Sequence, residues 1–262
     1  MRARKFITLV ALVMAGQLHS LASQAAETAA GSADTWSVKI TPYLWATRMH
    51  GSTQIKQLPE ARIDMSFSDI LDNLDAGFMG AVEFQKGRWC ILVDSLYMKT
   101  SDSVSVATRR GAAGADADMR ISQTMLSGAL AYRWLDSRPT ADVFVGVRYN
   151  RIEESLDLDA RVFGATAGLD HSQTVDWTEP LLGMRGRAPL TRDLAVVASA
   201  DVGGFGLGSD LTTQALVGLS WAMAERFDAE VGFRYMKIDY DKGDLVYDME
   251  NEGPYLGMTY HL

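Results

Sequence analysis

Short segments in which apolar and polar residues alternate recur along the chain, and this period of two constrains the fold more than any other feature. In DVFVGVRYN (142–150), the valines and Tyr149 share one face of an extended strand, while Asp142 and Arg148 share the other. DAEVGFRY (228–235) repeats the pattern. Such alternation predicts β-strands, because successive side chains of a strand point to opposite faces of its sheet. It suits either a soluble sandwich with the apolar face inward or a membrane barrel with the apolar face outward.

The lengths of the connections between these segments favour the barrel. Short links alternate with long ones; the short links lie at 85–88, 135–140, 189–193 and 224–228, and the long ones near 100–118, 155–172, 204–212 and 240–252. Up-and-down outer-membrane barrels have this rhythm, with tight turns in the periplasm and longer loops outside the cell. A Greek-key sandwich has no reason to produce it.

Tryptophan placement is a second indication of the same architecture. Trp89, Trp134 and Trp221 each lie at or near a short link. An outer-membrane barrel carries a girdle of aromatic residues at the periplasmic membrane interface, where its short turns lie. The alternative explanation is that aromatic residues are common in strands of every kind.

The sequence therefore predicts an all-β fold: a single closed, up-and-down, antiparallel transmembrane β-barrel of about ten strands, with eight or twelve as alternatives. We expect the strands at 37–48, 76–86, 88–99, 119–134, 141–154, 173–187, 193–204, 213–224, 228–239 and 253–262. The first link, 49–75, is the least regular. STQI (52–55) and ARIDMSF (61–67) would add a hairpin, and a helical turn capped by Ser68 would bury the isoleucine and leucines that follow it.

The start of the chain predicts export. It has a basic beginning, an apolar stretch over about 6–15, and Ser23 and Ala25 in the small-x-small pattern of a cleavage site. The alternative, a membrane helix of the mature protein, needs ~20 apolar residues, and this stretch is shorter. We expect a signal peptide at 1–25, a short periplasmic lead-in at 26–35 and the barrel at 36–262.

Charge and cysteine content limit the partners. Removing the expected signal peptide takes away Arg2, Arg4 and Lys5 and no acidic residue, so the net charge of −8 becomes −11. We expect no nucleic-acid partner, because phosphate binding needs an excess of Lys and Arg on one face. Cys90 is the single cysteine and has no partner for an intramolecular disulfide, so we interpret it as a small apolar filler in a strand.

Both ends of the expected barrel carry a family resemblance. WSVKITPYLWAT (36–47) and FSDILDNLDAGFMGAVEFQKGRW (67–89) resemble uncharacterised porin-like outer-membrane barrels of proteobacteria. The final alternation resembles the C-terminal strand signature of bacterial outer-membrane β-barrel proteins and consists of Leu256, Met258, Tyr260 and Leu262. That signature commonly ends in Phe or Trp, whereas this chain ends in Leu262. The resemblance implies a monomer in the Gram-negative outer membrane, in contact with its lipid and lipopolysaccharide and inserted by the barrel-assembly machinery.

An outward apolar face leaves a set of charged residues facing the lumen. They are Glu83, Asp94, Asp142, Arg148, Glu179, Arg185, Asp201, Glu230 and Arg234. Paired charges can satisfy each other there, whereas an unpaired one would cost several kcal/mol, and we expect Arg185 to pair with Glu179 or Glu230. Small barrels are usually filled by side chains. We therefore predict a filled lumen with a structural or interaction role; the alternative is a narrow porin-like channel for small solutes.

The sequence gives little reason to predict an enzyme, a cofactor or a metal site. Asp170, His171 and Ser172 adjoin, but neighbours on a strand point to opposite faces and rarely build a triad. The resembled class includes lipid-modifying enzymes and proteases, whose fuller motifs are not recognisable here; such an enzyme is the weakest alternative. The acidic segment 239–252 lacks the spacing of a calcium loop. We interpret it as a solvated outer loop, or one bridged to lipopolysaccharide by divalent cations.

Overall fold

Strands dominate the part of the chain that can be described. The computed structural model describes residues 35–55, 61–107, 113–162, 165–243 and 245–262. The expected signal peptide at 1–25, and all but the last residue of the lead-in at 26–35, lie outside these ranges. Within them, no helix is long and apolar enough to cross a membrane.

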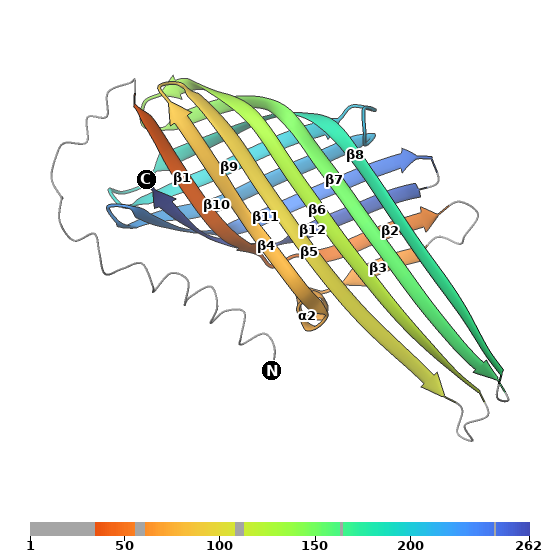
Figure 1. The fold of residues 1–262 in the computed structure, drawn as a ribbon. Coiled ribbons are helices and arrows are strands. Elements are labelled where there is room, and N and C mark those ends of the chain that lie inside the picture. Colours follow the sequence, from red (N-terminus) through yellow and green to blue (C-terminus); the bar gives the residue numbers. More distant parts are fainter. Residues whose placement is uncertain (1–34, 56–60, 108–112, 163–164, 244) are drawn as a thin grey trace. The chain divides into compact units, whose positions relative to one another are not determined.

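Ten antiparallel strands close into one barrel (Figure 1). They follow one another in chain order, and β1 pairs with β12 to complete the ring. The strands are β1 Trp36–Trp45, β4 Leu74–Lys86, β5 Trp89–Ala107, β6 Ala113–Asp136, β7 Thr140–Val162, β8 Ala165–Pro189, β9 Leu194–Gly204, β10 Leu211–Ala224, β11 Phe227–Lys242 and β12 Leu245–His261. The predicted closed, up-and-down barrel of about ten strands is confirmed.

Two further strands and a short helix fill the irregular first link. Strand β2 (Arg48–Ile55) pairs with the first half of β12, and β3 (Ala61–Met65) pairs with β2. The expected hairpin is therefore present, but it extends the sheet beside β12 and does not enter the ring. Helix α2 (Phe67–Asp72) follows it and leads into β4.

The cap of helix α2 differs from the prediction. Ser66, not Ser68, is the N-cap: its Oγ accepts a hydrogen bond from the Asp69 backbone N–H at 3.3 Å, and the Asp69 carboxylate accepts the Ser66 N–H at 2.9 Å. This reciprocal capping box needs an acid three residues after the cap, which Ser66 has and Ser68 lacks. The hydrogen bonds from Ser66 hold the pKa of Asp69 below its ordinary value. Within the helix, Ile70 is buried.

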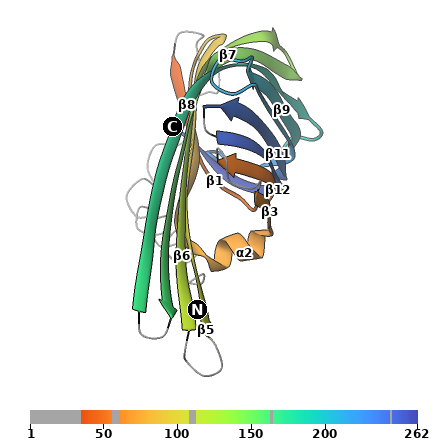
Figure 2. The same cartoon turned by 90° about the vertical axis from the view of Figure 1, so that its right-hand side faces the viewer.

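Three of the four expected long loops are wrong, because strands occupy most of their length. Strand β8 alone has 25 residues, which at 3.3 Å each is about 80 Å, whereas a tilted membrane strand needs only about 9–11 residues. Strands β5 to β8 therefore project beyond the others on the side away from the tight turns (Figures 1 and 2). Segment 239–252 is likewise a hairpin of β11 and β12, and only 205–210 remains a loop.

The outward face of the ring is an apolar belt. Val145, Val217 and Val231 are each more than half exposed on it. At the end of the barrel that carries the tight turns, here called the turn end, the indole rings of four tryptophans lie outward: Trp36, Trp89, Trp134 and Trp221. Leu256 and Met258 of the final strand face outward too, Leu262 just after the strand is exposed, and Tyr260 packs on Phe227. The belt is suited to contact with lipid chains.

This belt generates a stability prediction. Val145→Arg should lower the free energy of unfolding in lipid vesicles by about 2–4 kcal/mol, because a charge would replace a side chain at the centre of the apolar belt. Denaturant unfolding followed by tryptophan fluorescence measures the loss. Thr174→Arg, at an exposed site on the projecting part of β8, is the control and should change little. Equal losses for the two variants would contradict a lipid-facing belt.

Candidate functional site

The inner face of the barrel has two zones. Charged and polar side chains fill the zone nearer the turn end, and apolar side chains fill the zone nearer the opposite end, here called the loop end. All nine residues predicted to face the lumen do face the interior. The structure distributes eight of them over three clusters, and Glu230 lines a cavity outside these clusters.

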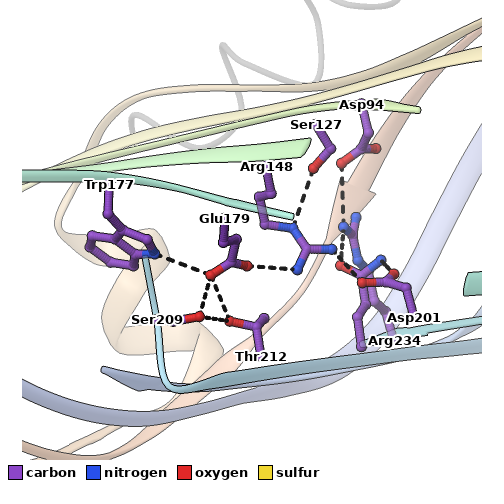
Figure 3. Close-up of polar contacts among 10 residues, drawn as sticks. Asp94, Ser127, Arg148, Trp177, Glu179, Asp201, Ser209, Thr212 and Arg234 are labelled. Atoms are coloured by element: carbon purple, nitrogen blue, oxygen red, sulfur yellow. Dashed lines mark hydrogen bonds and ion pairs between the residues drawn. The ribbon is translucent and has the colours of Figure 1, made fainter. Parts of the chain in front are cut away.

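The first cluster is centred on Arg148 (Figure 3). Its Nη1 donates to Glu179 Oε1 at 3.2 Å and its Nη2 to Asp201 Oδ1 at 2.5 Å, while Nε donates to Ser127 Oγ at 3.3 Å. Arg148 on β7 stands directly opposite Glu179 on β8, so strand register brings the pair together. Arg148 is 2 %, Glu179 0 % and Asp201 6 % exposed, so the three charges are almost completely buried.

Glu179 has further donors that sequence reasoning missed. Its Oε2 accepts Trp177 Nε1 at 3.2 Å, Thr212 Oγ1 at 3.0 Å and Ser209 Oγ. Ser209 lies in the loop between β9 and β10, so these bonds fasten that loop to the β8 wall. Trp177 has the same parity as Glu179 and could have been found; Ser209 lies outside any strand and gave no periodic signal.

The second cluster surrounds Arg234. Its Nη1 donates to Tyr43 OH at 2.9 Å, and its Nη2 donates to Gln214 Oε1 at 2.8 Å and to Asp94 Oδ1 at 3.3 Å. The guanidinium also lies 4.8 Å from the centre of the Trp45 ring, within cation–π range. Gln214 Nε2 donates in turn to an oxygen of Asp201 at 3.0 Å, which joins this cluster to the first.

The third cluster lies nearer the turn end and is centred on Arg185. Two parallel hydrogen bonds of 2.7 and 3.1 Å join its Nη atoms to Glu83, and Nε donates to Asp142 Oδ2 at 3.0 Å. Arg133, which was not predicted, donates to the other oxygen of Asp142 at 2.9 Å. The predicted pairing of Arg185 with Glu179 or Glu230 is therefore wrong. Asp142 is the cross-strand neighbour of Arg185, and Glu83 reaches it from β4. Alternation shows which face a residue occupies and not which neighbour it meets.

Two cavities adjoin the Arg185–Glu83 pair. One, of about 200 Å³, reaches the Arg148 and Arg234 clusters. The other, of about 220 Å³, lies nearer the turn end and includes Glu230. Both are lined by Arg185 and Glu83, so this ion pair separates them.

An apolar layer follows toward the loop end. Its buried members include Trp45, Leu96, Met98, Met125, Ile152, Trp177, Met236, Ile238, Tyr247 and Met249. Ile70 of α2 belongs to it, and Met49 and Met65 of the β2–β3 hairpin pack against it. A void of about 10 Å³ in this layer, lined largely by methionines, is at the lower limit for one water molecule.

Side chains that could act in catalysis or bind a metal are scattered over the structure. Residues 170–172 are consecutive positions within strand β8. His261 Nε2 lies 3.3 Å from Asp228 Oδ2. Cys90 is buried, with its Sγ 3.6 Å from Arg185. Among the side chains that the structure describes, no group of three His, Cys, Asp or Glu is placed to hold a metal ion.

Comparison with known proteins identifies the fold. No family model and no curated protein matches the sequence. The crystal structure of the outer membrane protease OmpT from Escherichia coli is similar, with a TM-score of 0.52 and 9 % identity, over 88 % of this chain and 100 % of that one. The chain has the fold of bacterial outer-membrane β-barrel proteins. The translocator domain of the autotransporter NalP from Neisseria meningitidis also matches, with a TM-score of 0.46 and 14 % identity over 99 % of this barrel chain and 96 % of its own.

The Arg148 cluster generates a second prediction. Arg148→Met should lower the free energy of unfolding by about 3–5 kcal/mol, because it leaves the carboxylates of Glu179 and Asp201 buried without their cation. Denaturant unfolding of the barrel in lipid vesicles measures it.

The control for this prediction lies on the same strand. Arg151 pairs with Glu153 on the outward face, where both side chains are nearly half exposed. Arg151→Met should cost about 1 kcal/mol or less. If the two substitutions cost the same, the buried cluster does not contribute as its geometry indicates.

Proposed function

We propose that the protein is an exported outer-membrane barrel with a closed lumen and a structural or interaction role. The observation that carries the proposal is the apolar layer across the loop end of the lumen. Tryptophan, methionine, isoleucine and tyrosine side chains build this layer, and a void within it measures about 10 Å³. A hydrated solute needs a wider and more polar passage than this.

The charged clusters support the same reading. Arg148, Arg185 and Arg234 each hold two or three hydrogen-bonded partners in the barrel interior. A selective pore needs charged groups that are free to meet a passing ion and release it. Here the cations and carboxylates are occupied with one another, as in a structural core.

The projecting part of strands β5 to β8 supports an interaction role. These strands continue well past the length needed to cross a bilayer (Figure 2). Outward ion pairs occur there, with Arg120 Nη1 3.0 Å from Asp157 Oδ2 and Arg151 beside Glu153. A polar sheet that extends beyond the membrane is a surface on which an external partner can bind.

The proposed surroundings follow from the same features. The barrel is a monomer in contact with outer-membrane lipid through its apolar belt and with lipopolysaccharide at the loop end, where divalent cations would bridge phosphates to the acidic β11–β12 hairpin. The barrel-assembly machinery would insert it, reading Leu256, Met258, Tyr260 and Leu262. Its acidity argues against a nucleic-acid partner.

A second candidate function is the narrow porin-like channel. The two adjoining cavities favour it, because charged side chains line both and together they span the turn-end zone of the lumen. An outer-membrane lipid-modifying enzyme or protease has less support. OmpT is named a protease, and at 9 % identity the likeness carries the fold alone.

Conductance in a planar bilayer separates these functions. The wild-type barrel should give no channel steps, and neither should Arg185→Ala, because the apolar layer remains intact beyond that residue. The triple variant Trp45→Ala, Met125→Ala and Met236→Ala should conduct, because it removes three large side chains that line the void in the layer and so widens it.

A matched triple variant controls for general loosening. Trp221→Ala, Met184→Ala and Met223→Ala remove the same residue types from the outward face and should not conduct. Heat-modifiable gel migration checks that every variant is folded. Channel steps in the wild type or in Arg185→Ala alone would reject the closed lumen and favour the narrow channel.

Orientation in the membrane gives a separate prediction. In a Cys90→Ala background, cysteines introduced at Gly168 and Asp241 should react with an impermeant maleimide on intact cells. Cysteines at Ser137 and Thr191, in the tight turns, should react only after permeabilisation. The reverse pattern would mean that the turn end faces outside.

A further inference from the structure

The turn-end cavity contains two charged side chains that differ from all the others in the lumen. Lys39 on β1 and Glu230 on β11 both line this space of about 220 Å³. Neither makes a hydrogen bond or ion pair with another residue of the described ranges. Each faces inward, because Lys39 has the parity of Tyr43 and Glu230 that of Arg234.

The other charges around this cavity are occupied. Arg185 binds Glu83 and Asp142, and Arg133 also binds Asp142. Arg187 donates to Ser220 Oγ at 2.7 Å and lies 3.6 Å from an oxygen of Asp228. Once these hydrogen bonds are set aside, one cation and one anion have no hydrogen-bonded partner in the described ranges, although Lys39 stands opposite Glu83 in the β1–β4 register and attracts Glu230.

Strand β12, which separates β1 from β11, supplies neither residue with a partner. The residue opposite Glu230 is Gly257, which has no side chain. Thr259 shares a hydrogen bond of 2.8 Å with Thr41. His261, opposite Lys39, lies beside Asp228. Both side chains are half-buried, and their hydrogen-bonding capacity is directed at the contents of the cavity.

We propose that this cavity binds a small zwitterion of the amino-acid type, with its carboxylate toward Lys39 and its ammonium toward Glu230. The charge balance selects the ligand: one free cation and one free carboxylate match a neutral molecule that carries both signs, and neither a simple anion nor a simple cation satisfies both. The volume is far above the ~10–15 Å³ that one water needs. The site lies on the turn-end side of the Arg185–Glu83 pair, so the ligand enters from that end, and binding does not depend on whether the lumen conducts.

The test compares a zwitterion with its two halves. L-Alanine carries both charges, propionate lacks the ammonium, and ethylammonium lacks the carboxylate. Ligand-observed NMR on the folded, detergent-solubilised full barrel should give a millimolar Kd for L-alanine. Each half-ligand should bind about tenfold more weakly, because one charge-assisted hydrogen bond is lost.

Charge-removing variants assign the two contacts. Lys39→Gln and Glu230→Gln should each weaken L-alanine binding about tenfold. Lys39→Gln should leave ethylammonium binding unchanged, and Glu230→Gln should leave propionate binding unchanged, a crossed pattern that general loosening of the barrel would not produce. Lys99→Gln, outward on β5, and Glu225→Gln, in the β10–β11 turn, are the matched controls and should have no effect.

Several results would overturn the proposal. If L-alanine does not bind at about 0.1 M, the cavity holds only water. Equal affinity for L-alanine and a half-ligand would show that the second charge makes no contact. Affinities unchanged in both Lys39→Gln and Glu230→Gln would place the ligand elsewhere.

Discussion

The constraint on which the rest of this structure depends is that no backbone polar group can remain unpaired in lipid. A sheet in a membrane must therefore have no open edge, and the pairing of β1 with β12 removes it. Once the ring is closed, strand parity assigns each side chain to lipid or to lumen. The apolar belt, the buried charges and the aromatic girdle at the turn end are consequences of that single division.

The lumen of this small barrel is filled by side chains in two different ways. Near the turn end, arginines occur with enough carboxylates, amides and hydroxyls to satisfy them, as Arg148 and Arg234 illustrate. Near the loop end, a core such as soluble proteins have is assembled from aromatic, branched and methionine side chains. Methionine is suited to this place, because its unbranched thioether adapts to the irregular gaps between curved strand walls.

The sequence predicts which face of the sheet a side chain occupies, because that depends on parity alone. It does not predict which residues meet across strands, which depends on register, or where strands rich in polar residues continue. The ring of ten strands and the inward position of every predicted charge followed from alternation. The partners of Arg185 did not, because Glu83 is far away in sequence and only the closed barrel brings it near. The pattern predicts loops at the projecting ends of β5 to β8, because small and polar residues predominate there. In TSDSVSVA (100–107) only Val104 and Val106 are larger apolar residues. Ser66 shows the local case: its cap depended on the position of one acid, Asp69.

On the edge that faces away from β11, strand β12 pairs with β2 along its first half and with β1 along its second. Those partners come from the start of the chain, and the Thr41–Thr259 hydrogen bond joins residues 218 positions apart. Contacts so distant in sequence form late, because the loop entropy must be overcome first. The β1–β12 pairing that closes the ring and the docking of the β2–β3 hairpin beside the apolar layer therefore both depend on β12, so that both are completed when this strand pairs.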